Sequence, residues 1–334
     1  MNGRALAVQG GLALAGLVAA YLTWQRQPEM QEGEVFVLDV TKNELQAVRF
    51  DDAENKTWAE LDRAKDARGA YVNLHVSARP EGPQKQPAAP ERRLRGNETA
   101  LRALERFAPL TALRTLGVLD AAKLKELGLD TSQKTLTVTT RAGQRRFTIA
   151  PAPPGGSEPY LRDPSDGRVF VVTRAILSDL QNAHTTLPER RLHDFKQTDV
   201  DRVVVTAGAT KKDYRASRND QGRALRLAPM AKPDSPDDSA RTWHDRLWGL
   251  WPAEILGRDE IPREGAPVPR LRVDYFAQGK NLGWIELAAS AAPPESASGP
   301  APKTTVFART EFTAGWVRLG GDAQPVIDDA AKLK

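Results

Sequence analysis

The most informative absence in this sequence is cysteine. The chain has 334 residues and no cysteine, which excludes disulfide bonds, thiolate catalysis, cysteine-bound zinc and the lipid anchor of a lipoprotein. Histidine is also scarce, and no two of the four histidines lie within four positions of each other, as a helical metal-binding pair would require. The four are His75, His184, His193 and His244.

The short motifs of the common enzyme classes are missing as well. The chain has no Gly-x-Ser-x-Gly, no Walker loop and no Gly-x-Gly-x-x-Gly after a strand, so nothing supports acyl transfer, nucleotide hydrolysis or dinucleotide chemistry. His193-Asp194 and His244-Asp245 resemble the His-Asp pairs of metal-dependent phosphohydrolases, but those enzymes need further ligands on a helical scaffold. Adjacent carboxylates at 51–52, 237–238 and 328–329 fall in expected loops or at helix edges. We therefore expect no catalytic residue, no metal and no cofactor.

Neither sign of charge dominates the chain. The 48 basic and 43 acidic residues are interspersed and give a net charge of +5, which is typical of a solvated surface. The densest basic clusters, at 92–95 and 141–146, are short and lack the interleaved aromatic residues on which bases stack. We expect no nucleic-acid binding. Hydrophobic residues make up 40% of the chain, enough to form a substantial core.

One long apolar run is present, at the N-terminus. Residues 5–24 have Gln9 and Thr23 as their only clearly polar members, and at 1.5 Å per residue a helix of this length spans about 30 Å, the hydrocarbon thickness of a bilayer. We predict a transmembrane anchor over residues 1–26, marked by Ala5, Leu12, Leu17, Tyr21 and Trp24. The acidic residues that follow favour an N-terminus in the cytoplasm, with the bulk of the chain in the periplasm, single-pass in the inner membrane.

Two alternatives to the anchor remain open. The small residues Val18-Ala19-Ala20 could satisfy the cleavage rule of a signal peptide, although the apolar run continues past them into an aromatic end. The run could also be the buried N-terminal helix of a soluble protein.

In the remainder of the chain the same order of secondary-structure elements occurs twice. In each half, strand-like segments are followed by a proline-rich loop, a helix closed by proline, further strands and a last helix. We predict an α+β fold of two tandem repeated units, each with a mainly antiparallel sheet and packed helices, at 33–187 and 188–334. In the first unit we expect strands at 35–40, 45–50, 56–61, 70–77, 135–140 and 146–150, and helices at 97–108, 120–127 and 173–183. In the second we expect strands within 193–205 and at 213–217, 224–227, 270–276, 283–288, 304–309 and 315–319, and helices at 242–251 and from 324.

Charged residues crowd the stretch 160–180, YLRDPSDGRVFVVTRAILSDL. Arg162, Asp163, Asp166 and Arg168 could form a reactive site, but the run Pro-Ser-Asp-Gly between two apolar segments is typical of a hairpin turn. We interpret it as a turn.

The segment TWHDRLWGLWP (242–252) is unusually rich in tryptophan. Trp243, Leu247, Leu250 and Trp251 fall on one helical face, which favours packing against the sheet, while Trp248 lies to the side. The alternative is that tryptophan anchors a partner protein, because exposed tryptophan is typical of interfaces. The possible contact residues are Trp243, Trp248 and Trp251.

Several short patterns resemble the bacterial family called domain of unknown function 4340. They are Gly128-Leu129-Asp130 before a strand, Tyr160-x-Arg162, the Val169–Val172 strand, Arg190-Arg191, and Phe195 followed by Asp199-Val200. The resemblance extends over about residues 33–330 and includes an N-terminal membrane helix. The chain departs from the family in its long proline-rich loops and in having Thr131-Ser132 where proline often follows.

This resemblance implies a membrane-anchored extracytoplasmic protein, since many members are encoded beside ABC transporters of the gliding-motility type. It offers no catalytic residues. Our leading hypothesis is a non-enzymatic accessory or scaffold subunit of an ABC-type transporter or envelope complex, which acts through protein-protein contacts in the bacterial cell envelope. The alternative is a periplasmic binding module for a cell-wall or polysaccharide polymer. A third hypothesis, a hydrolase, would need a deep cleft that holds two carboxylates.

Overall fold

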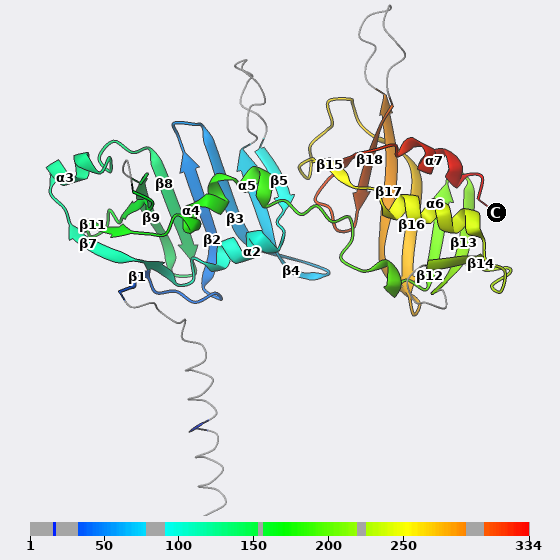
Figure 1. Ribbon diagram of the computed structural model, residues 1–334, viewed down its shortest axis with the longest axis horizontal. Coiled ribbons are helices and arrows are strands. Elements are labelled where there is room, and N and C mark those ends of the chain that lie inside the picture. The colour runs from blue at the N-terminus through cyan, green and yellow to red at the C-terminus, as the bar shows by residue number, and fades with distance from the viewer. Residues whose placement is uncertain are drawn as a thin grey trace, which may run out of the picture.

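The computed structural model describes residues 16–17, 33–77, 91–152, 156–218, 225–291 and 304–333 (Figure 1). Within them the chain forms two large antiparallel sheets, a small two-stranded sheet and short helices, which confirms a mainly antiparallel α+β fold. The predicted anchor lies outside the described residues, apart from positions 16 and 17. No helix in the described part of the chain is long and apolar enough to cross a membrane.

The first large sheet has nine strands in the order β5-β4-β3-β2-β8-β9-β10-β11-β7. In chain order they are β2 (Leu45–Asp52), β3 (Thr57–Asp66), β4 (Gly69–Ser77), β5 (Glu91–Arg95), β7 (Arg114–Val118), β8 (Lys134–Thr140), β9 (Gly143–Ala150), β10 (Tyr160–Arg162) and β11 (Arg168–Val171). A separate pair is formed by β1 (Val35–Leu38) and β6 (Leu110–Ala112). The helices are α2 (Glu98–Glu105), α3 (Ala121–Glu126), α4 (Ala175–Gln181) and α5 (Ala183–Thr186).

The second large sheet has eight strands in the order β14-β13-β12-β16-β17-β18-β19-β15. They are β12 (Arg202–Ala207), β13 (Thr210–Arg218), β14 (Leu225–Pro229), β15 (Pro252–Ile255), β16 (Val268–Ala277), β17 (Lys280–Ala291), β18 (Thr304–Thr310) and β19 (Val317–Leu319). A short 3-10 helix, η1 (Gln197–Asp199), precedes them, and the α-helices are α6 (Asp238–Trp248) and α7 (Gln324–Ala330).

The strand order of the second sheet repeats that of the first. Position by position, β14-β13-β12-β16-β17-β18-β19-β15 corresponds to β4-β3-β2-β8-β9-β10-β11-β7. The helices correspond in the same way: α6 precedes β15 as α2 precedes β7, and α7 follows β19 as α4 follows β11. Figure 1 shows the two sheets side by side, with β7 and β15 on the same side of each. The first half adds β5, α3 and the β1–β6 pair.

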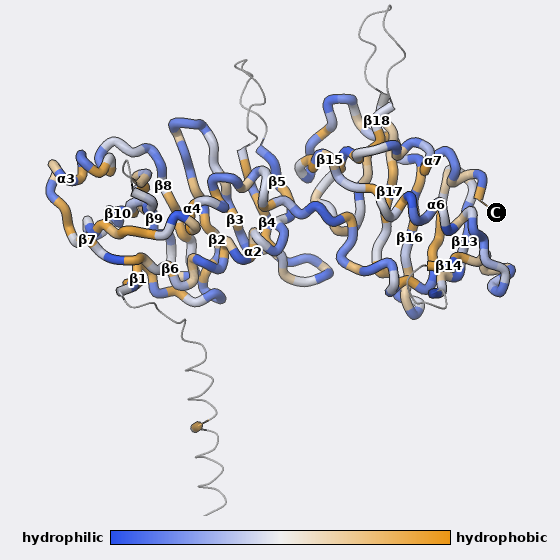
Figure 2. The backbone as a smooth tube through the Cα atoms, viewed as in Figure 1, coloured by the Kyte–Doolittle hydropathy of each residue, from blue (hydrophilic) through white to orange (hydrophobic). Residues whose placement is uncertain are grey.

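Each sheet is hydrophobic on the face that its helices cover. Along β16, Leu271, Val273 and Tyr275 are buried while the residues between them are partly exposed, so the strand alternates as a half-buried strand should. Figure 2 shows this alternation along the strands of both sheets. On the opposite face arginines lie over aromatic rings, with Arg272 4.5 Å from the Trp284 ring centroid.

Four strands, β5, β6, β7 and β15, occupy segments for which the sequence predicts a loop or no element. The segment 79–96 was predicted as a proline-rich loop, but its last residues form β5, which pairs with β4 and buries Leu94 among charged neighbours. A single buried residue in a charged strand produces too weak an apolar pattern to detect. β6, β7 and β15 are likewise short, and β7 and β15 lie at the edges of their sheets. Helix α6, which we expect at 242–251, runs from Asp238 to Trp248. It begins earlier because Asp237 caps it by accepting hydrogen bonds from the amides of Ser239 and Ala240.

The two halves meet through arginines of the first and carboxylates of the second. Arg92 contacts Glu260 at 2.8 Å, and the Arg258 amide donates to the carbonyl of Arg93 at 3.0 Å. Arg68, in the turn between β3 and β4, pairs with Asp194 and lies 3.5 Å from Glu311. Apolar contact adds to these polar ones, since Ile255 packs against the cores of both halves and Arg95 lies over the Phe312 ring at 4.4 Å.

Candidate functional site

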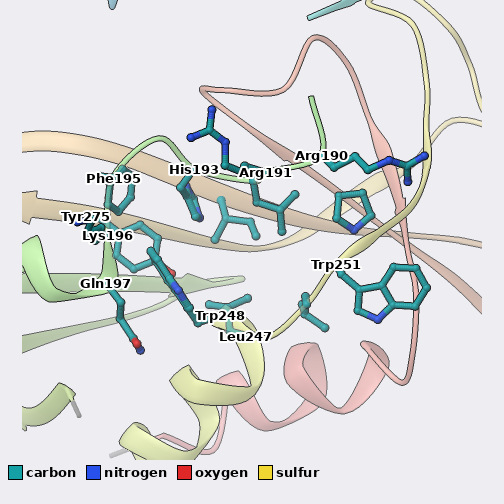
Figure 3. A pocket seen from close by; sticks show the side chains of 14 residues that line it. Arg190, Arg191, His193, Phe195, Lys196, Gln197, Leu247, Trp248, Trp251 and Tyr275 are labelled. Carbon is teal, nitrogen blue, oxygen red and sulfur yellow. The ribbon is translucent and has the colours of Figure 1, made fainter. Parts of the chain in front are cut away.

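A cavity of about 420 Å³ opens in the second half, beside the segment that joins the two halves (Figure 3). We call it the aromatic groove. Its walls come from residues 190–197, from the end of α6 and the chain after it, and from β16 and β17. The lining residues are Arg190, Arg191, Leu192, His193, Phe195, Lys196, Gln197, Leu247, Trp248, Leu250, Trp251, Pro252, Tyr275 and Ile285.

Helix α6 holds one wall in place. Trp243 is 1% exposed, and its indole N–H donates to the Val326 carbonyl in α7 at 2.8 Å, so the large ring is buried and its polar group is satisfied. Leu247 is also buried, against the sheet. These contacts fix the register of the helix, and the helix end then brings Trp248 to the groove.

Trp251 forms an open platform at one end of the groove. Its side chain is 57% exposed, and its ring lies so close to Gly320 that a Cβ atom there would approach the indole to 2.3 Å. The carbonyl of Trp251 also accepts a hydrogen bond from the Gly320 amide at 3.0 Å. One face of the indole therefore rests on the glycine backbone, and a large part of the ring remains accessible to a ligand.

Packed rings form the other end of the groove. His193 stacks on Trp248 with centroids 5.1 Å apart, and the rings of Phe195 and Tyr275 lie 5.8 and 5.6 Å from Trp248. Figure 3 shows Phe195, Gln197 and Trp248 at this end, opposite Arg190 and Trp251. Because four rings restrain one another, this end is rigid and preorganised.

His244 lies behind these rings and is neutral. Burial, followed by the nearby His193, lowers the pKa of His244 to about 4. The Gln197 side-chain amide donates to its Nδ1 at 3.2 Å, so the ring hydrogen is on Nε2, which has no hydrogen-bond partner among the described residues. Tyr275 is likewise fully buried, and burial together with Glu311 raises the pKa of its phenol. Its hydroxyl has no partner in the described part of the chain either.

The charged side chains that line the groove are all basic. Arg190, Arg191 and Lys196 line it, and none of its lining residues is acidic. Arg191 is engaged by Glu189, whose oxygens lie 3.1 Å from Nε and 2.8 Å from a terminal nitrogen. Burial opposes ionisation of Glu189, but the hydrogen bonds from Arg191 outweigh it and lower its pKa. Within the described residues Arg190 and Lys196 have no carboxylate partner, and both are exposed. The groove is therefore apolar inside and cationic at its ends.

The structure separates the three tryptophans proposed as contact residues. Trp248 and Trp251 line the groove, whereas burial leaves Trp243 no surface to offer a partner. The anchor residues Ala5, Leu12, Tyr21 and Trp24 lie outside the described residues. Sequence reasoning did not identify His193, Gln197 and Tyr275 as lining residues, because they approach α6 only in the folded chain.

The crowded stretch at 160–180 forms a hairpin. The amide of Gly167, at φ +75°, donates to the Asp163 carbonyl at 2.9 Å, and β10 pairs with β11. Asp163 is 2% exposed and is bound by Ser165 and Arg145. Burial opposes its ionisation, but these partners outweigh it and lower the pKa of Asp163.

The paired carboxylates have structural partners. Asp52 accepts from Asn55 and faces Lys134 at 3.2 Å, Asp237 caps α6, and Asp329 pairs with Arg246 and Lys332. In the described part of the chain no three His, Asp or Glu side chains converge as metal ligands would.

Comparison with known proteins gives one match, to a family model. The family "Domain of unknown function (DUF4340)" matches residues 104–245, a range that begins in α2, crosses the joining segment and ends in α6. It includes Arg190, Arg191 and Phe195 of the groove. No curated protein and no solved structure matches the chain. The resemblance predicted from the sequence is therefore confirmed for residues 104–245, which match the model of this family.

Proposed function

We propose that the protein is a non-enzymatic accessory subunit, anchored in the inner membrane by residues 1–26, that binds another envelope protein through the aromatic groove. The favoured partner is a membrane subunit of an ABC-type transporter or of a gliding-type envelope complex. The observation that carries the proposal is an exposed Trp251 near Arg190, which has no carboxylate partner among the described residues, at the mouth of an apolar cavity. Tryptophan and arginine are the residues that dominate binding energy at protein interfaces.

Two further observations support this role. The apolar run at 5–24 would confine the protein to the membrane that holds its partner and so raise its effective concentration beside that partner. The shared strand order supports a tandem repeat, in which the first unit (33–187) holds the second (188–334) at a distance from the anchor. A scaffold of this kind needs only a modest interface to stay associated.

Affinity purification tests the proposal directly. The tagged full-length protein is purified in mild detergent beside a variant that lacks residues 1–26, and the recovered proteins are identified by mass spectrometry. We expect stoichiometric recovery of transporter or envelope subunits with the full-length protein, and less with the shortened one. Recovery of the protein alone from both would overturn the accessory role.

A second candidate is a binding module for a cell-wall or polysaccharide polymer. The flat, accessible ring of Trp251 favours it, because such a platform can stack on a sugar ring. Under this alternative, purified cell wall would bind the protein saturably, and Trp251→Ala would abolish that binding. Sedimentation with insoluble cell wall distinguishes the two candidates.

A further inference from the structure

The aromatic groove lies at the position in the second half that corresponds to the β1–β6 strand pair in the first half. There the chain just before β2 forms β1, the chain just after α2 forms β6, and the two pair. The corresponding segments of the second half are residues 190–197, before β12, and 249–251, between α6 and β15. They face each other across the groove without forming strands, and Leu250 and Trp251 line it.

The first half also shows how much apolar surface this position can bury. Val37 of β1 is 7% exposed, while Leu110 and Ala112 of β6 are 0% and 2% exposed, and all three belong to the core of the first sheet. In the second half the same position leaves Trp251 57% exposed. The second half therefore leaves a large apolar side chain accessible beside the cavity at this position.

Resting on the binding role proposed above, we propose that this groove receives an extended segment of a partner protein that carries both carboxylates and large apolar side chains. The apolar side chains enter between Trp248 and Trp251. The carboxylates pair with Arg190 at one end and Lys196 at the other, the two lining cations with no acidic partner among the described residues. Because Arg191 is engaged by Glu189, Arg190 and Lys196 are the two cations left to select an anionic occupant by charge complementarity.

The polar groups of the groove disfavour a neutral sugar. Gln197 is the one side-chain amide in the lining, and it already bonds His244 at 3.2 Å and Asp245 at 3.3 Å. A neutral sugar would also leave the charges of Arg190 and Lys196 without an anionic partner, whereas the carboxylates of an acidic segment would pair with them.

Peptide binding to the full-length protein in detergent tests the proposal. The probe is a fluorescein-labelled twelve-residue peptide, (Glu-Val-Glu-Phe)₃, followed by fluorescence anisotropy. Two matched probes are (Lys-Val-Lys-Phe)₃, which reverses the charge, and (Glu-Ser)₆, which removes the apolar side chains. We expect saturable binding of the first probe and much weaker binding of both others.

Variants then test whether the peptide binds in the aromatic groove. The double variant Arg190→Glu/Lys196→Glu should weaken binding of the acidic probe at least about tenfold and gain affinity for the lysine probe. Trp251→Ala should weaken binding of the acidic probe by a similar factor. Arg226→Glu is the control, because Arg226 is equally exposed on β14 but does not line the groove, and it should change nothing.

Equal binding of the acidic and lysine probes, or affinity that neither groove variant alters, would overturn the proposal. So would binding of phosphatidylglycerol vesicles or of polygalacturonate that the groove variants abolish while no peptide binds, since the occupant would then be a lipid surface or an acidic glycan. If envelope subunits still co-purify with Trp251→Ala, the accessory role stands, but its contact lies outside the groove and this inference fails.

Discussion

His244 is the residue whose titration has the clearest consequence. The pKa of His244 is about 4 in the folded protein and 6.5 in the unfolded chain, so the unfolded state binds more protons between these values. The contribution to stability is present above pH 6.5 and is lost as the pH falls toward 4. Between pH 7 and pH 5 this group should lower the free energy of unfolding by about 2 kcal/mol.

The variant His244→Gln isolates that effect. Glutamine keeps a polar side chain beside Gln197 but does not titrate, so the variant should lose about 2 kcal/mol less than the wild type on going from pH 7 to pH 5. Urea denaturation followed by tryptophan fluorescence at the two pH values measures the difference. An identical pH dependence in both proteins would contradict the neutral buried state.

Asp163 is the residue that holds the 160–172 hairpin. Because its carboxylate is buried and bound by Ser165 and Arg145, Asp163→Ala should destabilise the protein by about 1–3 kcal/mol. Asp166, three residues on, lies at the surface of the turn and accepts its hydrogen bonds from Arg168, so Asp166→Ala should change stability much less than Asp163→Ala. Thermal unfolding of the two variants separates a structural carboxylate from a surface one.

At the scale of elements, the capped start of α6 positions the groove. Replacing Asp237 by alanine removes the acceptor for two backbone amides and should cost about 1 kcal/mol. Asp238, whose side chain is 91% exposed, serves as the neighbouring control and should have little effect when replaced. Chemical denaturation measures both, and equal losses would argue against the cap.

Most elements could be predicted from the sequence because their patterns are local. Alternation along β2 and β16 and the cap at Asn97 identify a strand or a helix from a few neighbouring residues. β5, β6, β7 and β15 escaped prediction because their pairing partners, rather than their own composition, make them strands. The groove escaped for a related reason, since residues 190–197 and 250–252 meet only through the tertiary fold.

At the scale of the whole molecule, Arg68 joins the two halves next to the groove. It pairs with Asp194 and approaches Glu311, and Glu311 in turn lies 3.4 Å from His193, the ring that stacks on Trp248. Interfaces between domains of one chain are often polar and permit relative motion. This arginine therefore restrains both the orientation of the halves and the wall of the groove.

Arg68→Ala should loosen the junction without unfolding either sheet. We expect cleavage by a limiting amount of trypsin within residues 188–201 to become several-fold faster, while the unfolding temperature changes by only a few degrees. Arg168→Ala, which removes an exposed arginine from the hairpin, is the matched control. Unchanged cleavage in the Arg68 variant would show that the remaining contacts suffice.

The strand order of the two sheets also bears on how the protein folds. The centre of each sheet joins strands far apart in the chain: Leu45 pairs with Thr140 across β2 and β8, and Arg202 pairs with Phe276 across β12 and β16. Such long-range pairing makes folding slow, because the chain loses the entropy of closing a long loop before the stabilising contacts form. During synthesis one edge of β2 in the β2–β3–β4 meander stays unpaired until its partner strand β8, which ends at Thr140, has been made. Over that interval the nascent chain is most exposed to aggregation and most dependent on chaperones.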